Sequence, residues 1–101
     1  MSALPKPERV RDREYLAFVR THPCAVCNER GVQAHHLKTR AAGGSDYHAV
    51  PLCADHHVEW HKLGDRTFTE RHTVNLWKVS AQLLAGYIDE RLRCGMHSPR
   101  S

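Results

Sequence analysis

The sequence predicts a small α+β domain in which a β-hairpin leads into a helix and two further helices flank this unit. Two short stretches with strand-like character, 33–37 and 47–52, stand on either side of a glycine turn signal. A helix-favouring segment and then a long apolar stripe at helical spacing follow them. Because 101 residues is near the usual size of one domain, we expect a single unit over 8–93, with a flexible leader at 1–7 and a flexible tail at 94–101.

The first expected element is a helix over 8–21. Its apolar residues recur at intervals compatible with one helical face: Val10, Tyr15, Leu16, Phe18 and Val19. Pro23 ends the helix, because the residue before a proline is pushed out of the α region. The chain then enters the Cys-x-x-Cys segment at 24–27 directly.

A β-hairpin is expected next, with strands at 33–37 and 47–52 joined by a long basic loop over 38–46. The loop ends in the turn signal Gly-Gly-Ser-Asp at 43–46. Pro51 suits an edge or terminal strand position because it lacks a backbone donor.

A helix over 54–63 follows the hairpin, with Gly64 as its C-cap. The segment 22–64 is therefore a β–β–α core with a cysteine knuckle at its start. A last helix is expected over about 74–93, where it covers the core. Its apolar stripe is Leu76, Val79, Leu83, Leu84, Tyr87, Ile88 and Leu92.

Composition favours a metal-binding protein with an anionic partner. The chain has nine histidines, and imidazole is the commonest metal ligand among side chains. Its formal charge of +4 suits nucleic acid or an acidic protein surface. No apolar run is long enough to span a bilayer and no signal-peptide core is present, so we expect a cytoplasmic protein without membrane contact. In that reducing compartment the four cysteines favour metal over disulfides.

The first candidate metal site is a structural zinc knuckle. Two ligand pairs have the spacing that lets two side chains hold one tetrahedral ion: Cys24-x-x-Cys27 and Cys53-x-x-His56. Thiolates are soft donors, and four protein ligands close the shell. In the alternative interpretation Cys53 is a buried core thiol and His56 a surface residue. Cys94-x-x-His97 is a competing pair, but it lies in the tail, and we interpret Cys94 as a free thiol.

The second candidate site is a reactive metal centre made of histidines. His57 and His61 are four residues apart on the expected helix and share a face, whereas His56 is rotated by about 100° from His57. His35 and His36 are adjacent on a strand, so one can bind metal while the other handles a proton. We assign His35, His57 and His61 to a divalent Mg²⁺, Mn²⁺ or Zn²⁺ ion with open positions, and His36 to the general base.

Three segments together resemble the HNH, or His-Me finger, nucleases: His-His-Leu at 35–37, the run 46–53 ending in Val-Pro-Leu-Cys, and His-x-x-x-His at 57–61. The two cysteine-containing pairs are similar to the zinc-containing branch of these ββα-metal enzymes. Order and spacing most resemble the small phage and prophage nucleases of the recombination-enhancement (Ref-like) type, including a downstream helix like 68–87. The resemblance covers about 22–90.

The resemblance implies a metal-dependent DNA endonuclease with His36 as base and His57 and His61 as ligands. One position departs from the family pattern, because His48 stands where an asparagine usually precedes the Val-Pro-Leu-Cys run. We interpret His48 as the residue that orients His36; it could instead be an extra ligand or be idle. If it is idle, Asp46 or a backbone carbonyl has to orient His36.

Four basic residues near the expected helix and hairpin loop are candidate phosphate contacts: Lys38, Arg40, Lys62 and Arg66. Each is otherwise an ordinary solvated charge. No set of side chains indicates base-specific readout, so weak sequence preference or targeting by a recombination protein or phage packaging partner is expected. Two rival functions are a non-catalytic zinc module that binds nucleic acid or protein, and a metal sensor or structural protein with two filled zinc sites.

Overall fold

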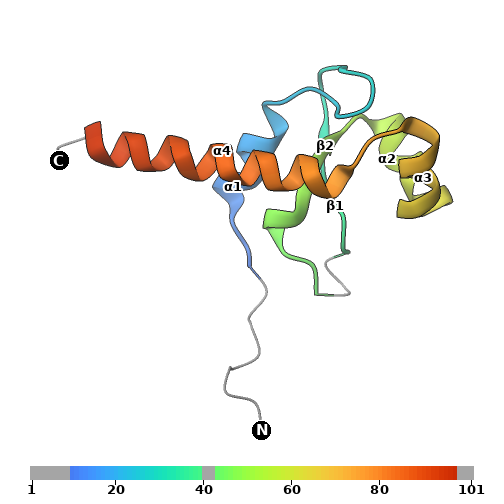
Figure 1. Cartoon of the computed structure of the whole chain (residues 1–101), viewed down its shortest axis with the longest axis horizontal. Coiled ribbons are helices and arrows are strands. Elements are labelled where there is room, and N and C mark those ends of the chain that lie inside the picture. Colours follow the sequence, from blue (N-terminus) through green and yellow to red (C-terminus); the bar gives the residue numbers. More distant parts are fainter. Residues whose placement is uncertain (1–9, 40–42, 98–101) are drawn as a thin grey trace, which may run out of the picture.

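The computed structural model describes residues 10–39 and 43–97, with side chains described as far as Arg93 (Figure 1). It has four α-helices and a two-stranded antiparallel sheet, which confirms the expected small α+β fold. The elements in chain order are α1 (Arg13–Arg20), β1 (Gln33–His36), the 3-10 helix η2 (Asp46–His48), β2 (Ala49–Leu52), α2 (Ala54–Leu63), α3 (Asp65–His72) and α4 (Leu76–His97). The predicted leader, the predicted contact Arg40 and the last four residues of the tail lie outside the described residues.

Helix α1 is shorter than the expected 8–21, because Asp12 is its N-cap. Asp12 has extended backbone angles, and its carboxylate accepts a hydrogen bond from the Tyr15 backbone N–H at 3.0 Å. The helix ends before Pro23, as predicted. Tyr15 and Val19, one turn apart, are completely buried and form the inner face of the helix.

The hairpin pairs β1 with β2 in the register Gln33↔Leu52 to His36↔Ala49. All four residues of β2 are buried. Pro51 is tolerated there because β2 has a single partner strand, and its carbonyl accepts a hydrogen bond from Ala25 N at 2.9 Å. This bond fixes the start of the cysteine segment against the sheet.

The hairpin loop depends on Gly44. A Cβ at this position would overlap the carbonyl oxygen of Lys38, so no other residue fits without a shift of the backbone. Gly44 also donates its backbone N–H to Thr39 O at 2.9 Å. The loop is therefore closed by backbone contacts just before η2 begins.

Helix α2 spans 54–63 as predicted and ends at Gly64, whose φ of 84° requires a glycine-like conformation. The chain then forms α3, in a segment that the sequence pattern assigned to no element. Thr73 ends α3 in the left-handed region, and α4 begins at Leu76 rather than at 74. It continues to His97, so the first four residues of the predicted tail are helical.

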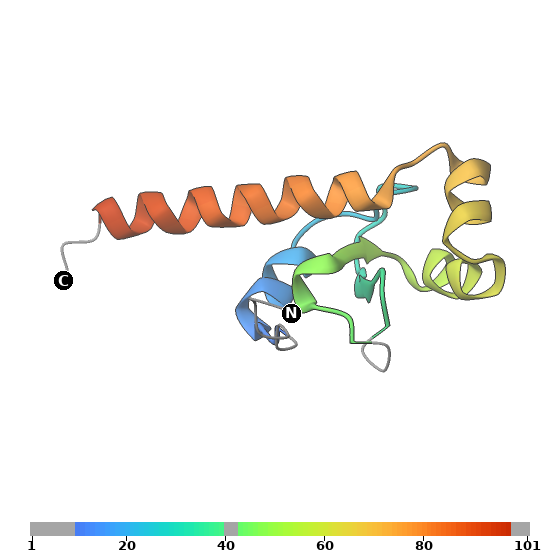
Figure 2. The ribbon, with the colours of Figure 1, turned by 60° about the horizontal axis from the view of Figure 1, so that its bottom comes forward.

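Two apolar clusters hold these elements together. The larger cluster joins the hairpin to α2, α3 and the first turn of α4, and its members include Leu52, Trp60, Phe68 and Leu76. The smaller cluster joins α1 to the middle of α4 through Tyr15, Val19 and Tyr87. Helix α4 thus runs past α1 and the hairpin with α2 and α3 at its start, and its last turns extend beyond the other helices (Figure 2). None of the helices in the described ranges is long and apolar enough to cross a bilayer.

Candidate functional site

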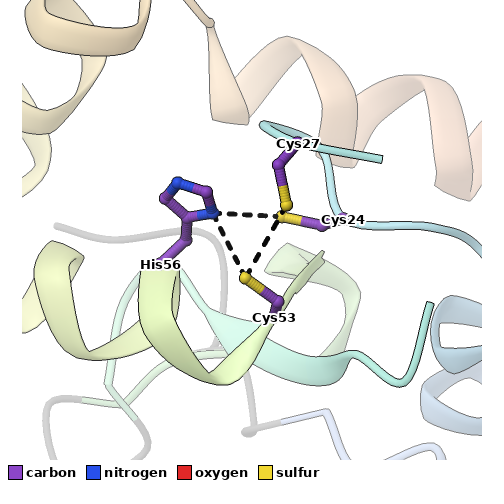
Figure 3. Close-up of side chains that lie close together, drawn as sticks. All are labelled: Cys24, Cys27, Cys53 and His56. Atoms are coloured by element: carbon purple, nitrogen blue, oxygen red, sulfur yellow. Dashed lines mark hydrogen bonds between the residues drawn. The ribbon is translucent and has the colours of Figure 1, made fainter. Parts of the chain in front are cut away.

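The four residues of the predicted zinc knuckle lie together at the junction of the cysteine segment and α2 (Figure 3). Cys53 is the N-cap of α2 and His56 lies in its first turn. His56 Nδ1 is 3.2 Å from Cys53 Sγ and 3.6 Å from Cys24 Sγ, and Cys27 Sγ is 3.8 Å from Cys53 Sγ. A tetrahedral zinc with Zn–S bonds of about 2.3 Å holds its sulfurs about 3.8 Å apart. The four side chains therefore lie close enough to hold a metal ion such as zinc.

The electrostatics of the knuckle favour a thiolate at Cys24 but not at Cys27, whose pKa is raised to about 11. Burial of Cys24 opposes ionisation, but hydrogen bonds from the backbone of Cys27, Cys53 and Val26 and from His56 outweigh it and lower the Cys24 pKa to about 6. A thiol with this pKa is largely ionised at neutral pH, which is the form that binds metal. Cys53 is only partly buried and points at His56, so this geometry does not favour the alternative of a core thiol beside a surface histidine.

A second cluster brings together His35 from β1 and His57 and His61 from α2. Their candidate ligand atoms all lie within 4.8 Å of one another. The rings of His35 and His57 are 4.6 Å apart, and those of His57 and His61 4.9 Å apart. His57 and His61 meet because they are one helical turn apart. His35 joins them because its side chain points from the hairpin toward α2.

Two ring nitrogens of this cluster need a partner. His35 is 1% exposed, and neither its Nε2 nor His57 Nδ1, both buried, has a hydrogen-bond partner in the described part of the chain. Buried polar atoms are seldom left unpaired, so a set of three imidazoles with two orphaned nitrogens fits a divalent metal ion well. The cluster borders a pocket of about 270 Å³ that is also lined by His36 and Thr39, which leaves room for a ligand.

Burial favours the neutral, metal-binding form of two histidines of this cluster, His35 and His57. The pKa of His35 falls to about 3, first because the ring is buried and then because His57, His61 and His36 repel a proton on it. Burial and His61 also lower the pKa of His57. A neutral imidazole is the form that ligates metal.

His36 lines the same pocket and is held by Asp46. Its Nε2 is 2.8 Å from Asp46 Oδ1, and the Asp46 side chain is 2% exposed. Burial alone would raise the Asp46 pKa, but the hydrogen bonds from His36 and the Asp12 backbone, together with the charges of His36 and Arg11, lower it. Asp46 is therefore ionised and can only accept. Consequently His36 presents an Nε2–H group to Asp46, and in the neutral ring the lone pair is on Nδ1.

The orienting role predicted for His48 is not what the structure has. His48 is exposed, and its ring packs against Trp77 at a centroid distance of 5.2 Å. Asp46 and His48 are the first and last residues of η2, and this tight turn directs Asp46 inward to His36. Asp46, the alternative to His48 for orienting His36, is thus the residue that contacts His36.

The predicted phosphate contacts are less closely tied to the pocket. Lys38 is exposed just after β1, and Lys62 is exposed beside His61 in the last turn of α2. The Arg66 side chain is 93% exposed and forms an ion pair with Glu70 on its own helix. The exposure of these three side chains is compatible both with ordinary solvated charges and with substrate contacts.

A third polar cluster lies beside the knuckle and was not expected from the sequence. His72 Nε2 and Glu59 Oε1 are 2.7 Å apart, Arg71 also contacts Glu59 at 3.0 Å, and the ligand atoms of His56, Glu59 and His72 lie within 4.8 Å. The hydrogen bond to His72 is the main reason that the Glu59 pKa is lowered. His72 could not be placed from sequence because α3 was not anticipated. This cluster ties α3 to the helix that carries the histidines.

The comparisons with known proteins concern relatives without an assigned activity. A family model described as "Protein of unknown function (DUF968)" matches residues 1–90. The uncharacterized protein YdfU of Escherichia coli (strain K12) is 32% identical over 98 residues, which is 92% of this chain. The chain spans only 26% of the length of that relative. No solved structure matches the chain.

Proposed function

Since the chain belongs to the DUF968 family of proteins of unknown function, we propose its activity from its own site: it is a metal-dependent endonuclease of the HNH type that hydrolyses phosphodiester bonds in DNA. The observation that carries this proposal is an incomplete metal centre next to an oriented base. Three imidazoles border a pocket, and two of their buried nitrogens have no partner among the described residues; the wall of that pocket also contains His36, held by Asp46.

The two metal centres differ in the way that structural and catalytic sites differ. The knuckle offers four donors and closes its shell, whereas the histidine cluster offers three and leaves positions open to a ligand. A divalent ion held by His35, His57 and His61 would stabilise negative charge on the scissile phosphate and on its leaving oxygen. The zinc knuckle would act as a staple, because it fixes the first turn of the helix that carries His57 and His61.

His36 is the proposed general base. Its Nδ1 lone pair accepts a proton from a water molecule as the water oxygen attacks phosphorus, and the bond between phosphorus and the leaving sugar oxygen breaks. Asp46 holds the ring in the tautomer that has this lone pair and stabilises the imidazolium that forms. A buried carboxylate fixed by three neighbours is suited to this positioning role. DNA is the partner that this function requires; a recombination or packaging protein as a second partner stays a prediction.

The activity is tested by incubating supercoiled plasmid DNA with the zinc-loaded chain and Mg²⁺, Mn²⁺ or added Zn²⁺ in separate reactions. We expect nicked or linear product with at least one metal, and loss of that product in His36→Ala. His22→Ala is the matched control, because the His22 side chain contacts Phe18 and Thr21 at the end of α1. Equal cutting by wild type and His36→Ala would refute the base assignment. Plasmid left intact under every metal, with DNA still bound, would favour the non-catalytic zinc module.

A further inference from the structure

We propose that the outer face of α1 forms a groove that binds the sugar–phosphate backbone of DNA next to the reactive site. This inference rests on the proposed function and adds the surface that holds the substrate. The groove has a volume of about 370 Å³. Its lining residues are Arg11, Arg13, Leu16, Arg20 and Asp46. None of the three arginines was singled out as a contact by the sequence pattern.

Helical geometry explains why these side chains share one surface. Arg13, Leu16 and Arg20 are separated by three and four residues, so they lie on one face of α1. Tyr15 and Val19 lie on another, buried face of the helix. The result is a solvent-facing row of two guanidinium groups with a partly buried leucine between them.

The positive charge of this row is not neutralised within the described ranges. Neither Arg13 nor Arg20 forms an ion pair there, whereas five other arginines do. The acidic residue of the helix, Glu14, lies on another face and pairs with Arg91 at 3.0 Å. Two unpaired guanidinium groups about two turns apart favour an extended anion over a small compact one, and Leu16 offers apolar contact to a sugar.

The groove is connected to the reactive site through Asp46. Arg11 NH1 donates to Gly44 O at 3.0 Å and lies 3.9 Å from Asp46 Oδ1, so this arginine is anchored at the end of the groove. The same carboxylate oxygen is 2.8 Å from His36 Nε2. Asp46 lines the groove and His36 lines the histidine pocket. A DNA backbone lying along α1 would therefore pass beside Asp46, the residue that holds the proposed base His36.

The test measures binding separately from cutting. A fluorescent DNA duplex of mixed sequence is titrated with the zinc-loaded His36→Ala chain, which leaves DNA uncut, at several salt concentrations. The variant pair Arg13→Gln/Arg20→Gln is compared with Lys78→Gln/Arg93→Gln, which removes the same charge from exposed positions on α4. Each phosphate contact contributes about 0.9 to the slope of log affinity against log salt. We expect the α1 pair to lower the slope by about 1.8 and to weaken binding on the order of tenfold or more at 0.1 M salt.

The control pair should change the affinity less than about threefold, and both pairs should keep the far-UV circular dichroism of the parent chain. An unchanged salt slope for the α1 pair, or an equal loss of DNA affinity in the control pair, would refute the proposed DNA-binding groove. The outcome is distinguishable from failure of the proposed function. Binding that depends on Arg13 and Arg20, with no plasmid cutting by the wild-type chain, would refute the nuclease function and support the groove. Plasmid cutting by the wild-type chain, with DNA binding that does not depend on these arginines, would support the nuclease function and refute the groove.

Discussion

Replacement of Asp46 by asparagine is the sharpest perturbation of the proposed base. Asparagine has nearly the same shape, so the buried site is kept, but one carboxylate oxygen becomes an NH₂ donor. Asp46 Oδ1 faces His36 Nε2 and Oδ2 accepts from Asp12 N at 2.8 Å. The amide keeps its acceptor toward Asp12 and presents its donor to His36. The proton of His36 then moves to Nδ1, and the lone pair needed for catalysis is lost.

The magnitude follows from two effects. A hydrogen bond to a charged group contributes about 1.5–3 kcal/mol, and its loss corresponds to a rate lower by about 10- to 150-fold. Trapping of the wrong histidine tautomer takes the loss in kcat toward about 10⁴, the size seen when the aspartate of a catalytic triad becomes asparagine. We therefore expect Asp46→Asn to lower kcat for plasmid nicking by a factor of about 10² to 10⁴, with its zinc content unchanged.

The assay is the initial rate of nicking at saturating metal and DNA. Asp89→Asn is the matched control, since Asp89 is exposed and pairs with Arg93 on the same helix. It should cut at the wild-type rate. If Asp46→Asn also cuts at the wild-type rate while remaining folded, then Asp46 does not set the tautomer of His36 and the proposed mechanism is wrong.

Three further predictions concern the metal, the loop and the buried histidine. Cys24→Ser should lose its zinc and unfold cooperatively at lower temperature, whereas Cys94→Ser should retain one zinc per chain; metal analysis and thermal melting check both. Gly44→Ala should destabilise the fold by about 1–3 kcal/mol because its Cβ overlaps a backbone carbonyl, while Gly86→Ala, open on α4, should stabilise it by up to about 1 kcal/mol; urea unfolding separates them, and equal midpoints would contradict the role of Gly44. The folded-state pKa of His35 is about 3 against an ordinary 6.5, so the unfolded chain binds the extra proton between these values. The contribution of neutral His35 to the free energy of unfolding is present above pH 6.5 and is lost as pH falls toward 3, by at most about 1.4 kcal/mol per pH unit. His35→Gln should flatten this dependence in urea melts, and a wild-type slope identical to that of the variant would refute it.

The fold was predictable where the sequence has strong local signals. The two strand-like stretches, the i, i+4 histidines and Gly64 were enough to give the hairpin and the span of α2. Helix α3 was missed because it has a single buried residue, Phe68, among polar neighbours, so it shows no periodic apolar stripe. The helix ends at Thr73 in a left-handed conformation, which is rare for a β-branched residue and so cannot be expected from the sequence.

The candidate metal ligands were predictable in part for the same reason. Spacing alone grouped the knuckle residues and put His57 and His61 on one helical face. Which of Asp46 and His48 faces His36 was beyond sequence reasoning, because it depends on a 3-10 turn that rotates side chains by a different angle from a strand. The arginine groove likewise required the position at which α1 begins, which the capping of Asp12 fixes.

Under the proposed mechanism, DNA cleavage requires a metal ion in the histidine pocket, distinct from the zinc of the knuckle. The most direct measurement is the nicking rate as Mn²⁺ or Mg²⁺ is titrated into protein that retains one zinc per chain, for wild type and His57→Ala. We predict that wild-type nicking rises with added metal and saturates, while His57→Ala retains its zinc and fold but cuts at least about 100-fold more slowly. A His57→Ala chain that responds to metal as the wild type does would contradict the claim.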